Sequence, residues 1–283
     1  MWIATLLAHL FGNTGYNTIL RHAASDRKRD PLFLAAVMSM AIAAPAVVGI
    51  FIVKIDWLLF TPHNLLVYAG CIAMLMLFHF LNAKALEETE ASVFAFIYNF
   101  RIGFATLFGI WFFGEGVVPI RFVGGGLVFV AGMILMGRST ASPKGIFFSI
   151  LTAIAIAVLN VFEKYLIIHV GYFGYAFPSA LIVMGFLWLV VLAGRRPVDK
   201  AFFKTRECGG LMVARCISAY GFTLALGFGA LLSVATYISA LTCVITPIAA
   251  VVFLKEKDSL KKKTIAGIVA LAGVTLIFLG HAE

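Results

Sequence analysis

Long apolar runs separated by short polar segments make up nearly the whole chain. Each run is about 20 residues long, which is enough for an α-helix to cross the ~30 Å hydrocarbon core of a bilayer. In lipid, the backbone N–H and C=O groups of such a run find hydrogen-bond partners only if the run forms a helix. The pattern predicts ten membrane-spanning helices, at about residues 2–22, 32–53, 64–84, 91–113, 119–137, 145–168, 173–194, 208–229, 231–254 and 264–280. The connections are too short to hold a soluble domain.

The composition agrees with this all-α integral membrane class. Hydrophobic residues make up 62% of the chain and charged residues only 12%, whereas a soluble domain carries about 25% charged residues. The first run starts at Trp2 without a basic segment before it, so we expect a retained helix. The cysteines lack paired spacing, and we expect small buried apolar residues rather than a disulfide or a metal site. No cofactor is predicted.

The formal net charge of +9 is distributed unevenly between the two sides of the predicted bundle. Seventeen of the 22 Lys and Arg residues lie in five alternate connections, at 21–31, 84–90, 138–145, 194–206 and 255–263. Three lie on the opposite side, at Lys54, Arg121 and Lys164. The positive-inside rule therefore predicts that the basic connections are cytoplasmic and both termini are outside. We expect these basic loops to contact anionic lipid, and we expect no nucleic-acid partner.

The chain contains an internal repeat. A shift of 141 residues places 86–137 on 227–278 without a gap, with ten identical pairs among 52. Among the matches are Glu115 with Glu256 and Gly126 with Gly267. Because the shift carries the fourth helix onto the ninth, each copy holds five helices, and an odd number inverts the second copy. The sequence thus predicts two inverted five-helix repeats, 1–139 and 140–283, the architecture of alternating-access transporters.

Several motifs in the two copies resemble the drug/metabolite transporter superfamily, and specifically its ten-helix EamA-type members. They are "FFGEG" (112–116) with "GLVFVAGMIL" (126–135), and "FLKEK" (253–257) with "GIVALAGVTL" (267–276). Pro247 also resembles the family pattern, whereas the first copy has Thr106 at the equivalent position. The resemblance implies a transporter, with export as its direction, and leaves open which of many small molecules is moved.

Arg101 is the charge placed deepest in an apolar run. It lies about ten residues from either end of its predicted helix, too far for easy snorkelling, so it must face a cavity or a partner. Tyr98 lies on the same face at i−3. A guanidinium beside an aromatic ring suits a pocket for a carboxylate or phosphate. The alternative is an internal brace bonded to helix-end carbonyls or to Glu163.

Polar stripes mark the first helix of each copy. One face of the first helix carries His9, Asn13, Tyr16 and Asn17. The sixth helix carries a similar group of polar residues, Asn160, Glu163 and Lys164. Such stripes either line a cavity or hydrogen-bond to neighbouring helices. Glu163 is the one acidic residue within a predicted span, which makes it and Lys164 candidates for proton coupling. Glu163 could equally be the partner of a nearby base.

The third, eighth and ninth helices supply the remaining candidates. His79 and Asn82 share a face, with interfacial packing as the alternative role. Arg215 lies about two turns inside its helix, where it either contacts substrate or snorkels outward. Tyr237, with Ser233 and Thr236, precedes the expected kink at Pro247. Glu115 and Glu256 lie in tight connections and are predicted to cap helix ends or meet loop bases.

The sequence favours a secondary active transporter, working by alternating access, of a small polar metabolite such as an organic anion or an amino-acid-like zwitterion. The predicted binding residues are Asn13, Tyr16, Asn17, His79, Tyr98, Arg101, Asn160, Arg215 and Tyr237. A lipophilic-cation exporter is the alternative within this class, with a membrane-embedded enzyme or a lipid scramblase as rivals of another class. The predicted location is a bacterial inner membrane, with a monomer or a homodimer left open and protons as the candidate coupling ion.

Overall fold

The computed structural model describes residues 1–24, 29–116, 118–136, 142–254 and 260–280. Over these residues, regular secondary structure is entirely helical. The main helices are α1 (Trp2–Ala24), α2 (Pro31–Ile52), α3 (Pro62–Glu88), α4 (Ala91–Tyr98), α5 (Arg101–Phe113), α6 (Pro119–Met136), α7 (Pro143–Val170), α8 (Tyr172–Ala193), α9 (Arg206–Gly227), α10 (Leu232–Ser239), α11 (Thr242–Ala249) and α12 (Leu260–Leu279). The all-helical class predicted from the apolar runs is confirmed.

Polar residues with proline set where several of these helices begin. The side chains of Asp30, Thr61 and Ser142 each accept a backbone N–H from the first turn of α2, α3 and α7, and proline follows each of them. The proline fits because the first helical N–H has no partner within the helix and the ring already has helical φ. These three start points lie within two residues of the apolar runs read from the sequence.

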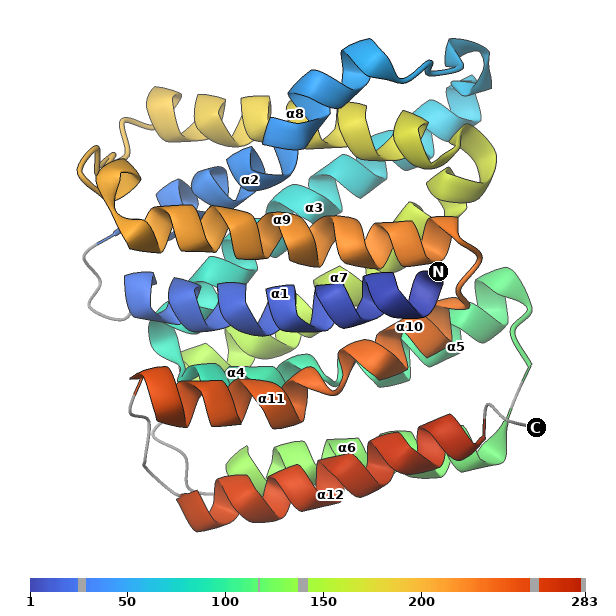
Figure 1. Cartoon of the computed structure of the whole chain (residues 1–283), viewed down its shortest axis with the longest axis vertical. Coiled ribbons are helices and arrows are strands. Elements are labelled where there is room, and N and C mark those ends of the chain that lie inside the picture. Colours follow the sequence, from blue (N-terminus) through green and yellow to red (C-terminus); the bar gives the residue numbers. More distant parts are fainter. Residues whose placement is uncertain (25–28, 117, 137–141, 255–259, 281–283) are drawn as a thin grey trace.

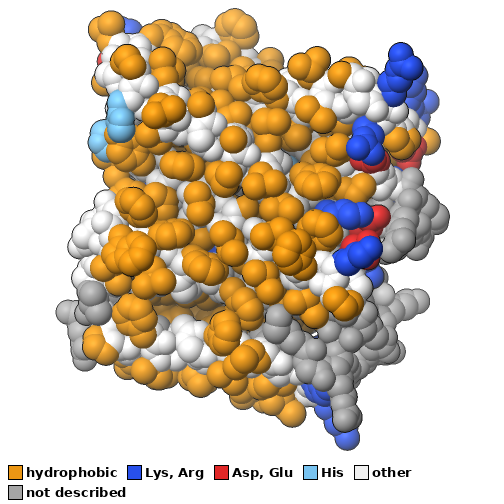
Figure 2. Space-filling view, turned by 180° about the vertical axis from the view of Figure 1, so that it is seen from behind, with side chains coloured by type: hydrophobic (Ala, Val, Ile, Leu, Met, Phe, Trp, Pro, Cys, Tyr) orange, Lys and Arg blue, Asp and Glu red, His pale blue; other side chains and the backbone are white. Residues whose placement is uncertain are grey.

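Seven helical stretches among the described residues are long and apolar enough to cross a membrane. They are 31–52, 62–88, 91–113, 143–170, 172–193, 206–227 and 232–254. Hydrophobic side chains also cover the face shown in Figure 2, while Lys and Arg gather along one edge of it. An outer surface that is apolar across the helices and charged at their ends belongs to a multi-pass integral membrane protein.

The helices lie side by side and pack in pairs (Figure 1). The largest contacts join α1 to α9, α3 to α7, α2 to α8 and α6 to α12. The α1–α9 contact depends on glycine, because a Cβ at Gly12 would lie 2.7 Å from the Ser218 nitrogen. Likewise α6 and α12 meet backbone to backbone at Gly124 and Gly273. The small residues let these helices approach more closely than larger side chains allow.

Two of the predicted spans are interrupted near their centres. The stretch 91–113 breaks between α4 and α5, and the stretch 232–254 breaks between α10 and α11. At the breaks, the Asn99 side-chain amide donates to the Ala240 carbonyl across 3.3 Å. The sequence predicts a kink at Pro247, but the second break comes several residues earlier, and Pro247 lies inside α11 just before a π-helical turn at Ala250–Leu254. A break frees backbone groups, which the crossing Asn99 contact partly satisfies.

Candidate functional site

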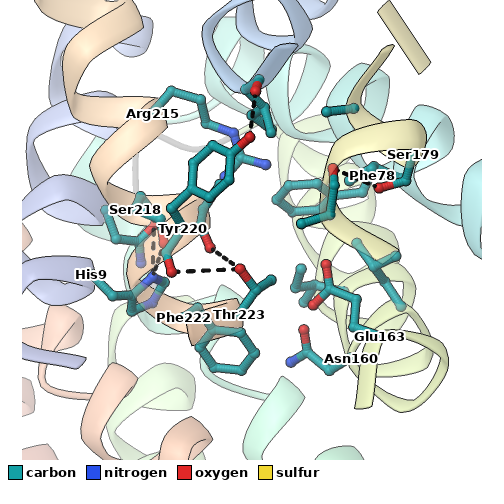
Figure 3. A pocket seen from close by; sticks show the side chains of 18 of the residues that line it. His9, Phe78, Asn160, Glu163, Ser179, Arg215, Ser218, Tyr220, Phe222 and Thr223 are labelled. Carbon is teal, nitrogen blue, oxygen red and sulfur yellow. Dashed lines mark hydrogen bonds between the residues drawn. The ribbon is translucent and has the colours of Figure 1, made fainter. Parts of the chain in front are cut away.

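A small polar cavity lies inside the bundle, with a volume of about 60 Å³ (Figure 3). Its wall is built by α1, α3, α4, α5, α7, α8 and α9, with one residue from α2. The polar and charged lining residues are His9, Asn13, Tyr16, Tyr98, Arg101, Asn160, Glu163, Tyr175, Ser179, Arg215, Ser218, Tyr220 and Thr223. Seven of the eleven predicted binding and coupling residues meet here.

Arg101 is buried in the cavity wall, with only 2% of its surface exposed. It is the first residue of α5, so the break after α4 fixes where its side chain begins. One guanidinium nitrogen donates to the Tyr98 hydroxyl at 3.0 Å, and the guanidinium carbon lies 4.2 Å from the centre of the Tyr98 ring. Nε and the second terminal nitrogen have no hydrogen-bond partner. Among the described residues, neither Glu163 nor another carboxylate forms an ion pair with it.

Arg215 reaches the same cavity from α9 and is 6% exposed. Its guanidinium carbon lies 5.1 Å from the ring centre of Tyr16 and 5.4 Å from that of Phe78. Its Nε has no hydrogen-bond partner. The side chain therefore points into the cavity, where aromatic faces offset part of the cost of burying its charge. Of the two roles left open by the sequence, the geometry favours the cavity over snorkelling.

Glu163 and Asn160 project into the cavity from successive turns of α7 (Figure 3). One Glu163 carboxylate oxygen accepts the Tyr175 hydroxyl at 2.5 Å. The Asn160 amide nitrogen is buried without a hydrogen-bond partner. Positions three apart on a helix share a face, which is why one short segment of α7 supplies both an anionic group and an amide.

The predicted stripe on α1 divides between the cavity and the helix contacts. His9, Asn13 and Tyr16 line the cavity, whereas Asn17 lies outside it and donates to the Asn13 amide oxygen at 3.2 Å. The His9 Nδ1 lies 2.6 Å from the Ser218 carbonyl, so this nitrogen donates and joins α1 to α9. Cavity lining and packing are both present, at different positions of one stripe.

Three further predicted residues also lie outside the cavity. His79 is fully buried beside Phe78, with neither ring nitrogen hydrogen-bonded. The Tyr237 hydroxyl meets the Thr106 hydroxyl at 2.8 Å, which joins α10 to α5. Lys164 forms an ion pair with Glu115 at 2.9 Å and lies over the Phe113 ring. The position of Lys164 next to Glu163 in sequence does not bring the two charges to the same place, because neighbouring residues diverge around a helix.

Glu115 joins three elements at the end of the bundle. Gly114 ends α5 in the left-handed conformation, φ 63°, which turns the chain so that Glu115 folds back over Gly109. Its carboxylate accepts the backbone N–H groups of Leu232 and Ser233, at 2.8 and 3.2 Å, at the start of α10. Burial acts to raise the pKa of Glu115, but hydrogen bonds from Ser233, Lys164 and Leu232 outweigh it and hold the pKa below its usual range. Glu115 thus caps a helix and meets a base, as its place in the sequence predicts; Glu256 lies outside the described residues.

Several cavity residues are not apparent from the sequence. Tyr175 and Ser179 come from the start of α8, and Ser218 and Thr223 from α9. None of them stands out, because single hydroxyl groups are common in apolar helices and bond to their own backbone, as Ser179 does to Ala176. The available signal was spacing, since Tyr175 and Ser179 lie one turn apart on the same helix face.

Comparison with known proteins gives this fold a family. Residues 1–137 match the EamA-like transporter family. This match covers just under half of the chain and places it in the drug/metabolite transporter superfamily. The EamA-like proteins are membrane transporters of the drug/metabolite type, and the resemblance to that superfamily drawn from the "FFGEG" segment is thereby confirmed.

A solved structure described only as "Crystal structure of protein" also has this fold. It aligns with a TM-score of 0.73 and 16% sequence identity, over 98% of this chain and 98% of that one. Among curated proteins, none matches this EamA-like chain in sequence. The likeness to the solved structure concerns the fold, so the chemistry of the transported molecule has to come from the cavity.

Proposed function

We propose that this EamA-like protein is a secondary active transporter of a small organic anion or amino-acid-like zwitterion. The observation that carries the proposal is Arg101, a charged side chain that is buried at the centre of the bundle, lines a cavity and keeps two nitrogens without partners. A buried guanidinium without a carboxylate is costly. Oxygen atoms of a carboxylate or phosphate would satisfy it in bidentate fashion. Export is the direction that the family resemblance implies.

In this proposal the chain crosses the membrane ten times, as two inverted five-helix halves, 1–139 and 140–283. The packing of the helices supports it. If corresponding helices of the halves are exchanged, the contact of α1 with α9 becomes that of α7 with α3, and both are among the largest in the structure. The same exchange only swaps the two members of the pair α2 and α8, and of the pair α6 and α12, so these contacts stay as they are.

The two helix breaks support the same symmetry. Asn99 and Ala240, which meet at the breaks, are 141 residues apart, the shift that aligns the repeats in the sequence. Corresponding positions touch one another only where they lie on a two-fold axis. Arg101 lies two residues after Asn99, so the proposed axis passes close to the cavity. Transporters with inverted repeats bind their substrates at such a boundary.

The cavity volume of about 60 Å³ is far below the roughly 300–1,000 Å³ of ligand pockets, so the cavity has to expand for a metabolite. Ion pairs join the two proposed halves at both ends of the bundle: Glu115 with Lys164 at 2.9 Å, and Glu90 with Lys263 at 2.8 Å. We therefore assign the structure to a contracted state of the alternating-access cycle. Opening toward one side would separate one of these pairs while the other holds.

Glu163 is the proposed coupling residue. It lies in the cavity, so a proton and the ammonium group of a zwitterionic substrate would compete for the same carboxylate. The titratable or charged groups around it are Cys71 of α3, Tyr98 of α4, Arg101 of α5, His9 of α1, Tyr172 and Tyr175 of α8, and Arg215 of α9. Lys164, the other predicted coupling residue, is held by Glu115 at the end of the bundle and serves as a tie in this proposal.

The orientation follows from the charges at the helix ends. In the proposal, the end of the bundle with the basic connections faces the cytoplasm of a bacterial cell, and both termini lie outside. The Glu115–Lys164 pair then closes the outer end and the Glu90–Lys263 pair the inner end. Reaction of cysteines introduced at the two ends with a membrane-impermeant maleimide in whole cells tests this, and labelling of the basic end would reverse the orientation.

Ligand-induced stabilisation tests the proposed function directly. A ligand that binds the folded protein raises its melting temperature by mass action. The panel would contain amino acids, organic acids, phosphorylated metabolites and quaternary amines. We expect anionic or zwitterionic ligands to stabilise the protein, and Arg101→Ala and Arg101→Lys to abolish or weaken the effect. Leu107→Ala, on the same helix but exposed outside the cavity, is the matched control. Stabilisation by quaternary amines alone, surviving Arg101→Ala, would replace the proposal with a cation exporter.

A further inference from the structure

The charges of the cavity wall do not balance. Arg101 and Arg215 contribute two permanent positive charges, because guanidinium groups stay protonated in proteins. Glu163 contributes one carboxylate, and its hydrogen-bond partner is the Tyr175 hydroxyl rather than either arginine. His9 donates its Nδ1 hydrogen to the Ser218 carbonyl and contributes no negative charge. Among the described lining residues, the cavity therefore carries one positive charge more than it neutralises.

The two guanidinium groups lie on one aromatic cluster, formed by Tyr16, Phe78 and Tyr98. Arg101 lies over Tyr98 at 4.2 Å, Arg215 lies over Tyr16 and Phe78, and the Phe78 and Tyr98 ring centres are 6.5 Å apart. Both arginines have at least one guanidinium nitrogen without a partner. A single carboxylate of a ligand can be bidentate to one guanidinium. Two separate arginines with free donors call for two anionic groups.

Glu163, on α7, supplies a carboxylate that complements the two arginines. Its carboxylate shares only one oxygen with the Tyr175 hydroxyl, and Asn160 lies on the same face of α7. Neither arginine forms an ion pair with it. A ligand ammonium is the group that would pair with this carboxylate while two ligand carboxylates pair with the arginines. The resulting sum of charges in the filled cavity is zero.

We propose that the cavity selects an amino dicarboxylate, a molecule with two carboxylates and one ammonium. Arg101 and Arg215 would each hold one carboxylate, and Glu163 would hold the ammonium. This inference rests on the proposed function, because it assumes that the cavity is the substrate site. It goes beyond that function by separating molecules of nearly equal size: glutamate from glutamine, which lacks one charge, and from glutarate, which lacks the ammonium.

The test is a comparison of ligands that each lack one of the three charges. Affinities of the purified full chain for L-glutamate, L-aspartate, L-glutamine, glutarate and 4-aminobutyrate are measured by thermal shift and by isothermal titration calorimetry. We expect one of the two amino dicarboxylates to bind tightest, and glutamine, glutarate and 4-aminobutyrate to bind roughly 30-fold more weakly or worse, because each leaves one buried cavity charge unpaired.

Variants connect each charge of the ligand to one residue. Arg215→Gln should remove the preference for the amino dicarboxylate over glutamine, while leaving the affinity for glutamine nearly unchanged. Glu163→Gln should remove the preference over glutarate. Arg215→Lys keeps the charge and should retain part of the preference, which separates loss of recognition from loss of folding. Leu107→Ala is the control outside the cavity, and each variant is compared at equal monodispersity.

The outcomes separate this inference from the proposed function. If glutamine binds as tightly as glutamate and Arg215→Gln changes neither affinity, the inference is wrong and the transporter of zwitterions stands. If glutarate binds tightest, Glu163 does not hold an ammonium and the inference is wrong in that part. If quaternary amines alone bind, the inference and the proposed function both fail.

Discussion

Replacing Glu115 with glutamine should lower the stability of the folded transporter by about 1.5–3 kcal/mol, the range for hydrogen bonds to a charged group. The side chain of Glu115 is 4% exposed and that of Lys164 is 12% exposed, so solvent screens the pair little. Glutamine has nearly the same shape and can still accept one N–H of α10. What it removes is the negative charge beside Lys164.

The magnitude translates into a measurable change in melting temperature. At about 2–4 °C per kcal/mol for a chain of this size, Glu115→Gln should melt roughly 3–12 °C below the wild type. Lys164→Met removes the other partner. A double-mutant cycle with both changes should give a coupling energy of about 1–3 kcal/mol, because the two side chains share one interaction.

A matched surface pair provides the control. Arg196 lies 3.6 Å from Asp30, and its side chain is 53% exposed. Exposed ion pairs contribute about 0–1 kcal/mol, so Arg196→Gln should leave the melting temperature almost unchanged. A coupling energy between Glu115 and Lys164 of only about 0–1 kcal/mol, the range of exposed ion pairs, would refute the reasoning, since it would mean that the buried contact does not join the two proposed halves.

The pH dependence of the same variant gives a second check. The ordinary pKa of Glu115 is 4.5, and its pKa in the folded protein is lower. A lowered pKa means that the folded state holds this proton less tightly than the unfolded state, so the carboxylate stabilises the fold above pH 4.5 and the contribution is lost as the pH falls toward the folded value. The difference in melting temperature between wild type and Glu115→Gln should therefore be full at pH 7 and shrink below about pH 4.5. A difference that stays constant to pH 3 would contradict this.

Three further changes test separate parts of the account. Gly124→Leu should destabilise the protein by about 1–3 kcal/mol or prevent folding, because its Cβ would collide with the Gly273 carbonyl, whereas Gly125→Leu next to it meets open space and should be tolerated; size-exclusion profiles and melting curves distinguish them. Asn99→Ala should cost about 1 kcal/mol and change transport more than stability, since it releases the contact between the two helix breaks; equal transport rates would argue against a role for the breaks. Glu163→Gln should flatten the pH profile of transport, and an unchanged profile in proteoliposomes would remove the coupling role.

The broad architecture could be predicted because a membrane simplifies the physics. Burial in lipid requires long apolar helices, and the runs in the sequence therefore match the observed helix starts, as at Pro31 and Pro143. That Arg101 faces a cavity or a partner could be predicted because an ionised group is rare in such a run. The lack of hydrogen-bond partners for two of its nitrogens could not be predicted, because it depends on which groups the seven other helices of the cavity wall place beside them.

The remaining differences come from contacts that are remote in sequence. Lys164 looked like a cavity residue because it follows Glu163, but its partner is Glu115, 49 residues earlier. Tyr237 likewise bonds to Thr106, 131 residues away. The helix break at Asn99 has no proline or glycine at that point to announce it. Helical periodicity gives the face of a residue, and only the packing of helices decides what that face meets.

The most direct measurement for the central claim is solute counterflow into proteoliposomes, using the ligand that gives the largest thermal stabilisation. The account predicts counterflow by the wild type and by the control Leu107→Ala. It predicts a loss of at least about 30-fold in apparent affinity for Arg101→Gln, with partial recovery in Arg101→Lys. Counterflow by Arg101→Gln at the wild-type rate and affinity would show that the buried arginine is a structural brace and that substrate takes another route through the bundle.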